Sequence, residues 1–181
     1  DIILSRSDEF ATFIATAAAV GFDSVLQATD VQRTEFVPNE QAFQSLLPSN
    51  LLQPYLDFDV WTLDYIQTLL FCHEVPHSEV VAADLQNGTT FIPCVDVSDP
   101  AYLITLPPPR ISKSTMPNDA NIVEVDLLAD NGVVHIVDQV LTNSFLVRWF
   151  CAITLLLIHR IKPSLNIPWC GSEFPNIHSI P

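Results

Sequence analysis

Two neighbouring segments late in the chain have the pattern of hydrophobic and polar positions that a β-hairpin requires. Val123, Val125 and Leu127 alternate with acidic residues, which is the period of a strand with one buried face. Asn131-Gly132 follows, and both residue types tolerate the positive φ of a tight turn. The pattern therefore predicts a hairpin whose two-residue turn is Asn131-Gly132.

The segment after this turn is apolar on both of its faces. Residues 133–140 place valine and isoleucine on either side, with His135 among them. A strand of this composition is typical of the middle of a sheet. We expect His135 to be a core histidine whose ring N–H bonds to a backbone group or a carboxylate, and not a catalytic base. We expect Asp138 to bond to a loop amide or to solvent.

The first half of the chain has helical spacing instead. Ser7 precedes two carboxylates and a series of apolar residues that Gly21 ends, which predicts a helix beginning at Ser7. Pro38 should end a strand, and Asn39 is a good N-cap for a second helix. A third helix is predicted from about Asp59 to residue 70.

Short strands are predicted from Val75 onward. The candidates are Val80-Val81, residues 89–92 and residues 102–106. Pro107-Pro108-Pro109 marks a loop or a sheet edge, because proline cannot donate to a ladder. Helices first and antiparallel strands later indicate the α+β fold class.

Three segments of this sequence have a family resemblance. Residues 34–43 (TEFVPNEQAF), residues 69–76 (LLFCHEVP) and residues 131–141 (NGVVHIVDQVL) occur in this order. Together they resemble the signature motifs of the fasciclin-like domain, a secreted adhesion module of the fasciclin and periostin family. Cys72 stands where that family usually has tyrosine, and the resemblance covers roughly residues 1–145.

The resemblance implies a fold and a set of signature positions. The fold is a wedge of two β-sheets with several N-terminal helices packed around it. The expected domain is residues 1–145, followed by a separate tail at residues 146–181. The residues that match the structural signature are Phe36, Pro38, Asn39, Phe43, Asn131, Gly132, His135 and Asp138.

Composition narrows the range of partners. The net charge is −14, and residues 1–145 hold 20 of the 21 acidic side chains but only 4 of the 7 basic ones. An acidic surface repels phosphate backbones, so nucleic acid is not expected as a partner. With 4 glycines and no phosphate-cradling pattern, no nucleotide or other cofactor is expected.

Several features fit a secreted protein. The chain begins at Asp1, so we expect that a targeting peptide was removed or that this is an excerpt of a longer protein. Asn87-Gly88-Thr89 is a glycosylation sequon in a polar turn. The sequence also has four cysteines, of which Cys72 is expected to be a buried small residue, and a Cys72–Cys94 bridge is the alternative.

The tail has a different composition from the rest. Trp149 to Ile158 is an apolar run of ten residues, too short for a spanning helix, which needs roughly 20. Four prolines after it prevent long regular structure. We expect a poorly ordered or loosely docked appendage, with membrane association through the tail as the less favoured alternative.

His73-Glu74-Val75-Pro76-His77 formally matches the zinc-protease motif His-Glu-x-x-His. That motif requires a continuous helix, and Pro76 would break it. His73, His77 and Glu79 are therefore retained only as weak candidates for a metal site.

The resemblance also suggests adhesion contacts. In the periostin type, an Asp-Ile pair before the last hairpin is implicated in integrin recognition, and Asp126-Leu127 matches it here. His73 belongs to the second proposed contact segment. The alternative is that Asp126 is only the polar side of an alternating strand.

The sequence therefore predicts a non-enzymatic domain at the cell surface or outside the cell. It would mediate adhesion or matrix association through protein or carbohydrate contacts, with a cell-surface receptor or a matrix or wall component as partner. A tail-anchored module that binds polysaccharide or a small ligand is the alternative. A metal-dependent hydrolase is the third hypothesis.

Overall fold

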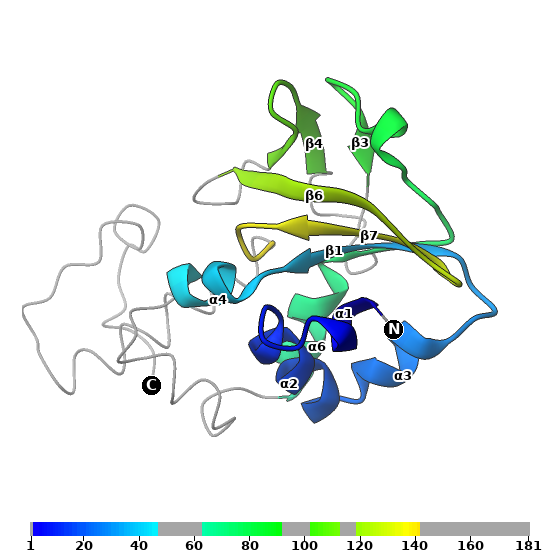
Figure 1. Cartoon of the computed structure of the whole chain (residues 1–181), viewed down its shortest axis with the longest axis vertical. Coiled ribbons are helices and arrows are strands. Elements are labelled where there is room, and N and C mark those ends of the chain that lie inside the picture. The colour runs from blue at the N-terminus through cyan, green and yellow to red at the C-terminus, as the bar shows by residue number, and fades with distance from the viewer. Residues whose placement is uncertain (1, 47–62, 92–101, 113–118, 142–181) are drawn as a thin grey trace, which may run out of the picture.

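A seven-stranded sheet is covered on one side by helices (Figure 1). The structure is a computed structural model that describes residues 2–46, 63–91, 102–112 and 119–141. The helices are α1 (Ile2–Ser5), α2 (Ala11–Ala19), α3 (Phe22–Gln27), α4 (Glu40–Leu46), α6 (Leu63–Phe71) and the 3₁₀ helix η1 (Ala82–Asp84). The strands are β1 (Arg33–Pro38), β2 (Glu74–Pro76), β3 (Thr90–Phe91), β4 (Tyr102–Thr105), β5 (Arg110–Ser112), β6 (Ala120–Ala129) and β7 (Gly132–Val137).

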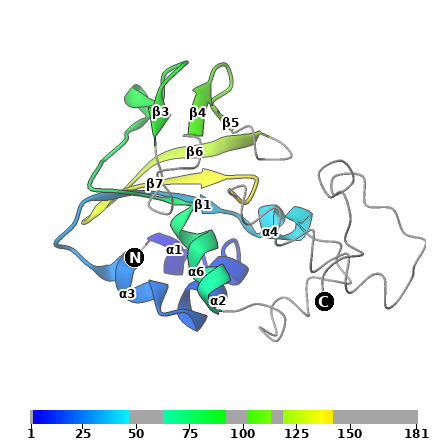
Figure 2. The same ribbon diagram turned by 180° about the vertical axis from the view of Figure 1, so that it is seen from behind.

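The strands follow the order β2-β1-β7-β6-β5-β4-β3. All neighbours are antiparallel except β1 and β7, which are parallel. The long strand β6 joins the two halves, because Ala120 and Asn121 pair with β5 and residues 122–129 pair with β7. Figure 2 shows β3 and β4 on one side of β6 and β7, with helices α1, α2, α3 and α6 on the other. This arrangement is the predicted α+β wedge.

The central pair β1 and β7 is buried on both faces, as the sequence predicted for β7. Residues alternate along β1, so Phe36 faces one way while its neighbours face the other. The Phe36 ring stacks on Phe91 of β3 with ring centroids 4.9 Å apart, and on His135 of β7 at 5.3 Å. These rings fill the core between the two halves of the sheet.

The hairpin turn differs from the prediction by one residue. Ala129 pairs with Gly132, so the two-residue loop is Asp130-Asn131 and Gly132 already belongs to β7. Gly132 has φ +143°, and a Cβ there would lie 1.8 Å from the carbonyl oxygen of Arg33. This glycine therefore serves the close approach of β1, and not the centre of the turn.

The buried face of β6 also differs from the prediction. Val123 and Val125 are 54% and 37% exposed, whereas Ile122 is buried. The pairing of β6 with β7 shifts between Ile122 and Glu124, and again between Glu124 and Leu127. Such irregularities break the strict alternation of inward and outward side chains. The alternation in the sequence therefore placed Val123 and Val125 on the buried face, which is wrong.

The first long helix begins later than predicted, at Ala11 and not at Ser7. Its start is capped from a distant part of the chain, because the Glu40 carboxylate accepts hydrogen bonds from the Thr12 N–H (3.0 Å) and the Thr12 hydroxyl (2.8 Å). The Asn39 cap is confirmed, since its side-chain oxygen accepts from the Ala42 N–H at 2.9 Å.

Two of the three short strands predicted after Val75 are confirmed, and the third is wrong. Strands β3 and β4 lie within the predicted segments, and the three prolines form the turn between β4 and β5. Val80-Val81 is not a strand, because the Val80 N–H donates to the Thr34 hydroxyl and not to a ladder. The predicted helix start near Asp59 and the tail at residues 146–181 lie outside the described residues, so the boundary at residue 145 stays a prediction.

Gly132→Ala should destabilise the domain by about 3 kcal/mol or more, because the added methyl group would overlap the Arg33 carbonyl group and strand β1 would have to move. Gly88→Ala is the matched control. Gly88 also has positive φ (+87°), but a Cβ there meets nothing within 4 Å, so only about 1 kcal/mol should be lost. Urea unfolding of the three proteins checks this, and equal losses would contradict it.

Candidate functional site

The most elaborate polar arrangement on the hairpin joins β6, β7 and the loop before η1. His135 Nδ1 accepts from the Asp126 N–H (3.3 Å), so its Nε2–H donates to the Val80 carbonyl oxygen (2.6 Å). Asp126 Oδ1 then accepts from the Ala82 N–H at 2.7 Å. His135 is fully buried, and burial lowers its pKa. The predicted core histidine is thus confirmed, and it fixes the loop against the hairpin.

Asp126 lies at the surface in an unusual conformation. Its φ is +59°, at one of the register shifts of β6, and its side chain is exposed. Leu127, the other half of the predicted contact pair, is only partly exposed and packs against the core. Of the predicted Asp-Leu pair, Asp126 is therefore the residue most available to a partner.

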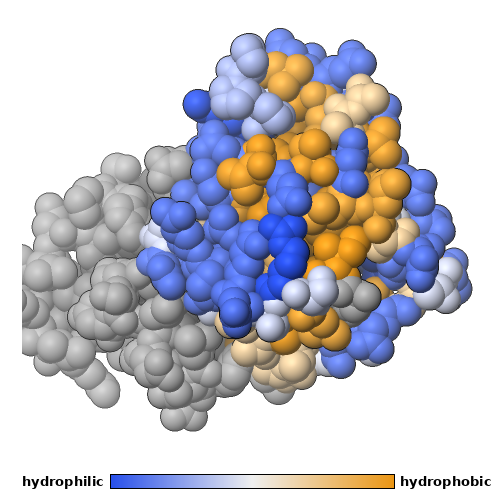
Figure 3. Space-filling model, in the orientation of Figure 1, coloured by the Kyte–Doolittle hydropathy of each residue, from blue (hydrophilic) through white to orange (hydrophobic). Residues whose placement is uncertain are grey.

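Exposed apolar side chains flank Asp126 along β6. Val123, Val125 and Leu128 are 54%, 37% and 70% exposed. We call Val123, Val125, Asp126 and Leu128 together the β6 surface. Figure 3 shows apolar residues gathered over the sheet on the face it draws. The sequence placed Val123 and Val125 in the core, so this surface was missed.

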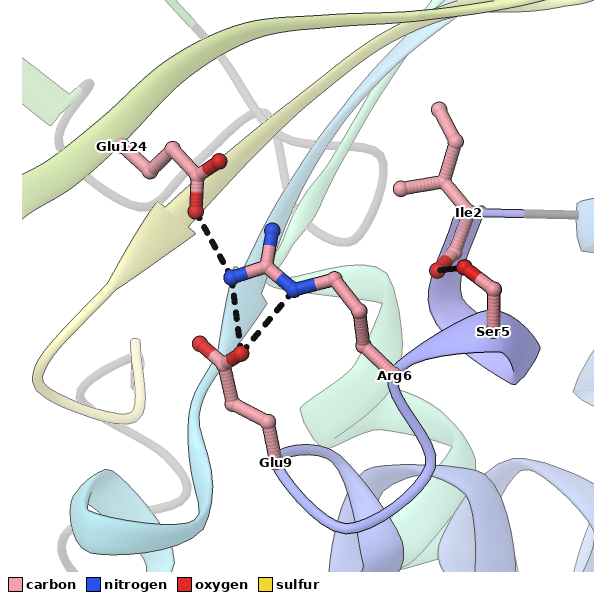
Figure 4. A network of polar contacts seen from close by, with 5 residues as sticks. All are labelled: Ile2, Ser5, Arg6, Glu9 and Glu124. Carbon is pink, nitrogen blue, oxygen red and sulfur yellow. Dashed lines mark hydrogen bonds and ion pairs between the residues drawn. The ribbon is translucent and has the colours of Figure 1, made fainter.

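An ion-pair network lies beside this surface (Figure 4). Arg6 Nη2 is 2.7 Å from a carboxylate oxygen of Glu124 on β6 and 2.7 Å from one of Glu9. Hydrogen bonds to these two carboxylates raise the pKa of Arg6. The side chains are about one-third exposed, so the network contributes at most about 1 kcal/mol. Its main effect is to hold the turn after α1 against β6.

His73 lies inside the core and not at the surface. It is 1% exposed, its Nδ1–H donates to the Leu69 carbonyl oxygen (2.9 Å), and its Nε2 accepts from the Leu141 N–H (2.9 Å). Burial lowers its pKa to about 4. This placement corrects the prediction that His73 contacts a receptor, since both ring nitrogens bind the chain itself.

The structure does not bring the weak metal candidates together. His77 and Glu79 are exposed, whereas His73 is buried, and β2 stands where a zinc-protease motif would need a helix. His77 has φ +58°, a left-handed backbone conformation that favours glycine. Within the described residues, no group of three or more His, Cys, Asp or Glu side chains is arranged to hold a metal ion.

The remaining predicted residues are placed as follows. Asn87 is exposed in a turn, where a glycan could be attached, and its side-chain oxygen accepts from the Leu106 N–H at 3.3 Å. Asp138 accepts from both the backbone N–H and the side-chain amide of Asn121. Asn121 lies on strand β6, which corrects the prediction of a loop amide or solvent as the partner. Cys72 is buried, while Cys94 and the tail cysteines lie outside the described residues.

The burial of three charged residues was not predicted from the sequence. Arg33 and Glu35 lie on β1, and Glu74 on β2 is paired with Arg33 at 3.3 Å. The signal was present, because Arg33 and Glu35 alternate with apolar or small residues directly before a buried Phe-Val pair. This spacing does not by itself indicate burial, because charged residues two apart ordinarily mark the solvent face of a strand.

Comparisons with known proteins agree with this geometry. The family model described as "Fasciclin domain" matches residues 8–143, so the chain belongs to the fasciclin domain family. That family is associated with adhesion-like roles and is generally non-enzymatic, extracellular or surface-associated.

Two relatives illustrate the similarity. "Protein sll1483" from Synechocystis sp. is 25% identical over 139 residues, which are 77% of this chain and 70% of that protein. A structure described as a FAS1 domain pair from the insect cell adhesion molecule fasciclin I superposes with a TM-score of 0.61 at 17% identity. The match covers 76% of this chain and about half (48%) of that one, and it shows the fold alone.

Among the residues that the structure describes, no helix is both long and apolar enough to cross a bilayer. Residues 146–181 lie outside the described residues, so membrane association through the tail stays a prediction.

His73 should make stability fall in mild acid. The unfolded chain takes up a proton below pH 6.5, whereas the folded ring stays neutral down to about pH 4. The stability present at neutral pH is therefore lost as the pH falls between these values, by roughly 3 kcal/mol. Urea unfolding between pH 7 and pH 4 measures the loss.

His73→Gln provides the control, because it keeps a hydrogen-bonding side chain that does not titrate. It should be less stable at pH 7 by about 1–3 kcal/mol, since one ring nitrogen's bond is lost. Its stability should nevertheless depend less steeply on pH than that of the wild type. Parallel pH profiles would show that His73 does not cause the acid sensitivity.

Proposed function

We propose that this domain is a non-enzymatic adhesion or matrix-association module that works outside the cell or at the cell surface. Its partner would be a cell-surface receptor or a matrix or wall component, bound through the β6 surface. The observation that carries the proposal is the exposure of three apolar side chains around Asp126 on one strand.

The chemistry of the β6 surface suits a protein partner. Val123, Val125 and Leu128 would lose water on contact, and buried apolar area provides most of the favourable free energy of association. Asp126 adds a carboxylate at the centre, which can pair with a cation or complete the coordination of a metal ion on a receptor.

Two hydrogen bonds hold Asp126 in one conformation at the surface. Its N–H is bound by the buried His135 ring, and its Oδ1 by the Ala82 N–H. A side chain held in this way loses little conformational freedom when a partner binds. The acidic character of the domain favours basic partners and disfavours other acidic surfaces.

Substitutions on the β6 surface test the proposal. Val123→Thr combined with Val125→Thr keeps the shape and the strand propensity of both residues but places hydroxyl groups where a partner would exclude water. We expect the coating concentration for half-maximal cell attachment to rise about tenfold, corresponding to about 1.4 kcal/mol. Cells and purified matrix or wall polymers on coated plates provide the measurement.

Asp126→Asn separates charge from structure. Asparagine tolerates positive φ and keeps an acceptor oxygen for the Ala82 N–H, so the fold should be retained. Attachment should still weaken about tenfold if the negative charge binds a cation of the partner.

Leu103→Thr is the matched control, because Leu103 is 39% exposed but lies on β4. It should leave attachment unchanged. Attachment that is insensitive to both sets of β6 substitutions, or equally sensitive to Leu103→Thr, would rule out the β6 surface as the contact.

A further inference from the structure

A cavity of about 580 Å³ lies between the first three helices and the sheet. Figure 1 shows these helices packed against the side of β1 that faces away from β3 and β4. Its apolar wall includes Phe13, Ile14 and Ala17 of α2, Leu26 of α3 and Val134 of β7. This volume is in the range of small-molecule sites, which are mostly apolar with a few polar groups.

Two buried charged side chains line this apolar cavity. Arg33 and Glu35 are two residues apart on β1, so they face the same side of the sheet. They are 5% and 3% exposed. Both carboxylate oxygens of Glu35, and Nε of Arg33, have no hydrogen-bond partner among the described residues. Such groups are rare in folded proteins, and an unoccupied ligand position is one physical explanation.

Among the described charged residues around the cavity, Glu35 has no basic residue paired with it. Arg33 is already paired with Glu74 at 3.3 Å, so Glu35 is in excess. Burial and the neighbouring Glu74 raise the pKa of Glu35 well above its usual range, and Arg33 offsets this only in part. Among the described residues that line the cavity, the other ionisable ones, Asp23 and Asp130, are also acidic. A cationic group is therefore the complement that the cavity lacks.

We propose that this cavity binds a small apolar molecule that carries a primary or secondary amine. Its hydrocarbon part packs against α2 and α3, and its ammonium group donates hydrogen bonds to the Glu35 carboxylate. An anionic ligand is disfavoured, because Arg33, the only basic residue among the described residues that line the cavity, is already paired with Glu74. Leu128 of the β6 surface also lines this cavity, whereas Val123, Val125 and Asp126 do not. The amine proposal does not depend on the adhesion function.

Three probes of equal chain length test the proposal: octylamine, 1-octanol and octanoate. By isothermal titration calorimetry, octylamine should bind the whole chain one to one and at least tenfold more tightly than the other two. Glu35 must ionise to pair with the ammonium group, so one proton is released to the buffer. Because burial raises the pKa of Glu35, octylamine affinity should rise as the pH is raised, and the released proton appears as a buffer-dependent heat.

Two variants locate the site. Glu35→Gln keeps the shape of the side chain and removes the charge, so octylamine should bind at least tenfold more weakly while 1-octanol is unaffected. Ala18→Trp places a large ring on an exposed position of the cavity wall and should abolish octylamine binding. Val123→Thr, on the β6 surface, should change the affinity for neither octylamine nor 1-octanol.

Circular dichroism and thermal unfolding establish that each variant is folded. Equal affinities for the three probes, or octylamine binding that survives Glu35→Gln in a folded protein, would overturn the assignment of an amine. No saturable binding of any probe would overturn the site itself. Loss of cell attachment with intact octylamine binding would bear only on the adhesion proposal.

Discussion

The parallel pairing of β1 with β7 is the interaction on which the rest of the structure depends. Six residues of each strand are in register, and all are buried. One face of the pair supports the helices, and the other supports the Phe36 stack beneath β3. The pairing requires Gly132, because only a residue without Cβ lets the hairpin approach the Arg33 carbonyl group. A single glycine thus sets how closely the first residues of the two central strands approach each other.

Two buried histidines bind backbone groups of segments that are distant in sequence or lie outside regular strand pairing. His135 binds the Val80 carbonyl group and the Asp126 N–H, and His73 binds the Leu141 N–H. In each case a neutral ring satisfies a backbone group that would otherwise be left without a partner. The same device positions Asp126 on the outside, so the proposed contact surface depends on a core residue. Burial also makes both histidines resist protonation.

Much of the fold could be predicted from local patterns. The Asn39 cap, the doubly apolar strand β7 and the interruption of the zinc motif by Pro76 depend on residues close in sequence. The candidate site was harder. Asp126 was identified through a family motif, but its partner Ala82 is 44 residues away. The exposed valines were assigned to the core, because irregular pairing along β6 cannot be read from a period of two.

By itself, the sequence determined the α+β class, the family, the enclosed β7 strand and the acidic surface, since these follow from composition, periodicity and contiguous motifs. Only the tertiary structure decided that Glu40 caps α2, that His73 is internal, and that Glu35 lies unpaired against an apolar cavity. These features arise where distant segments meet. The burial, the hydrogen-bond partners and the charge state of a side chain depend on these contacts between distant segments. A local sequence pattern does not contain that information.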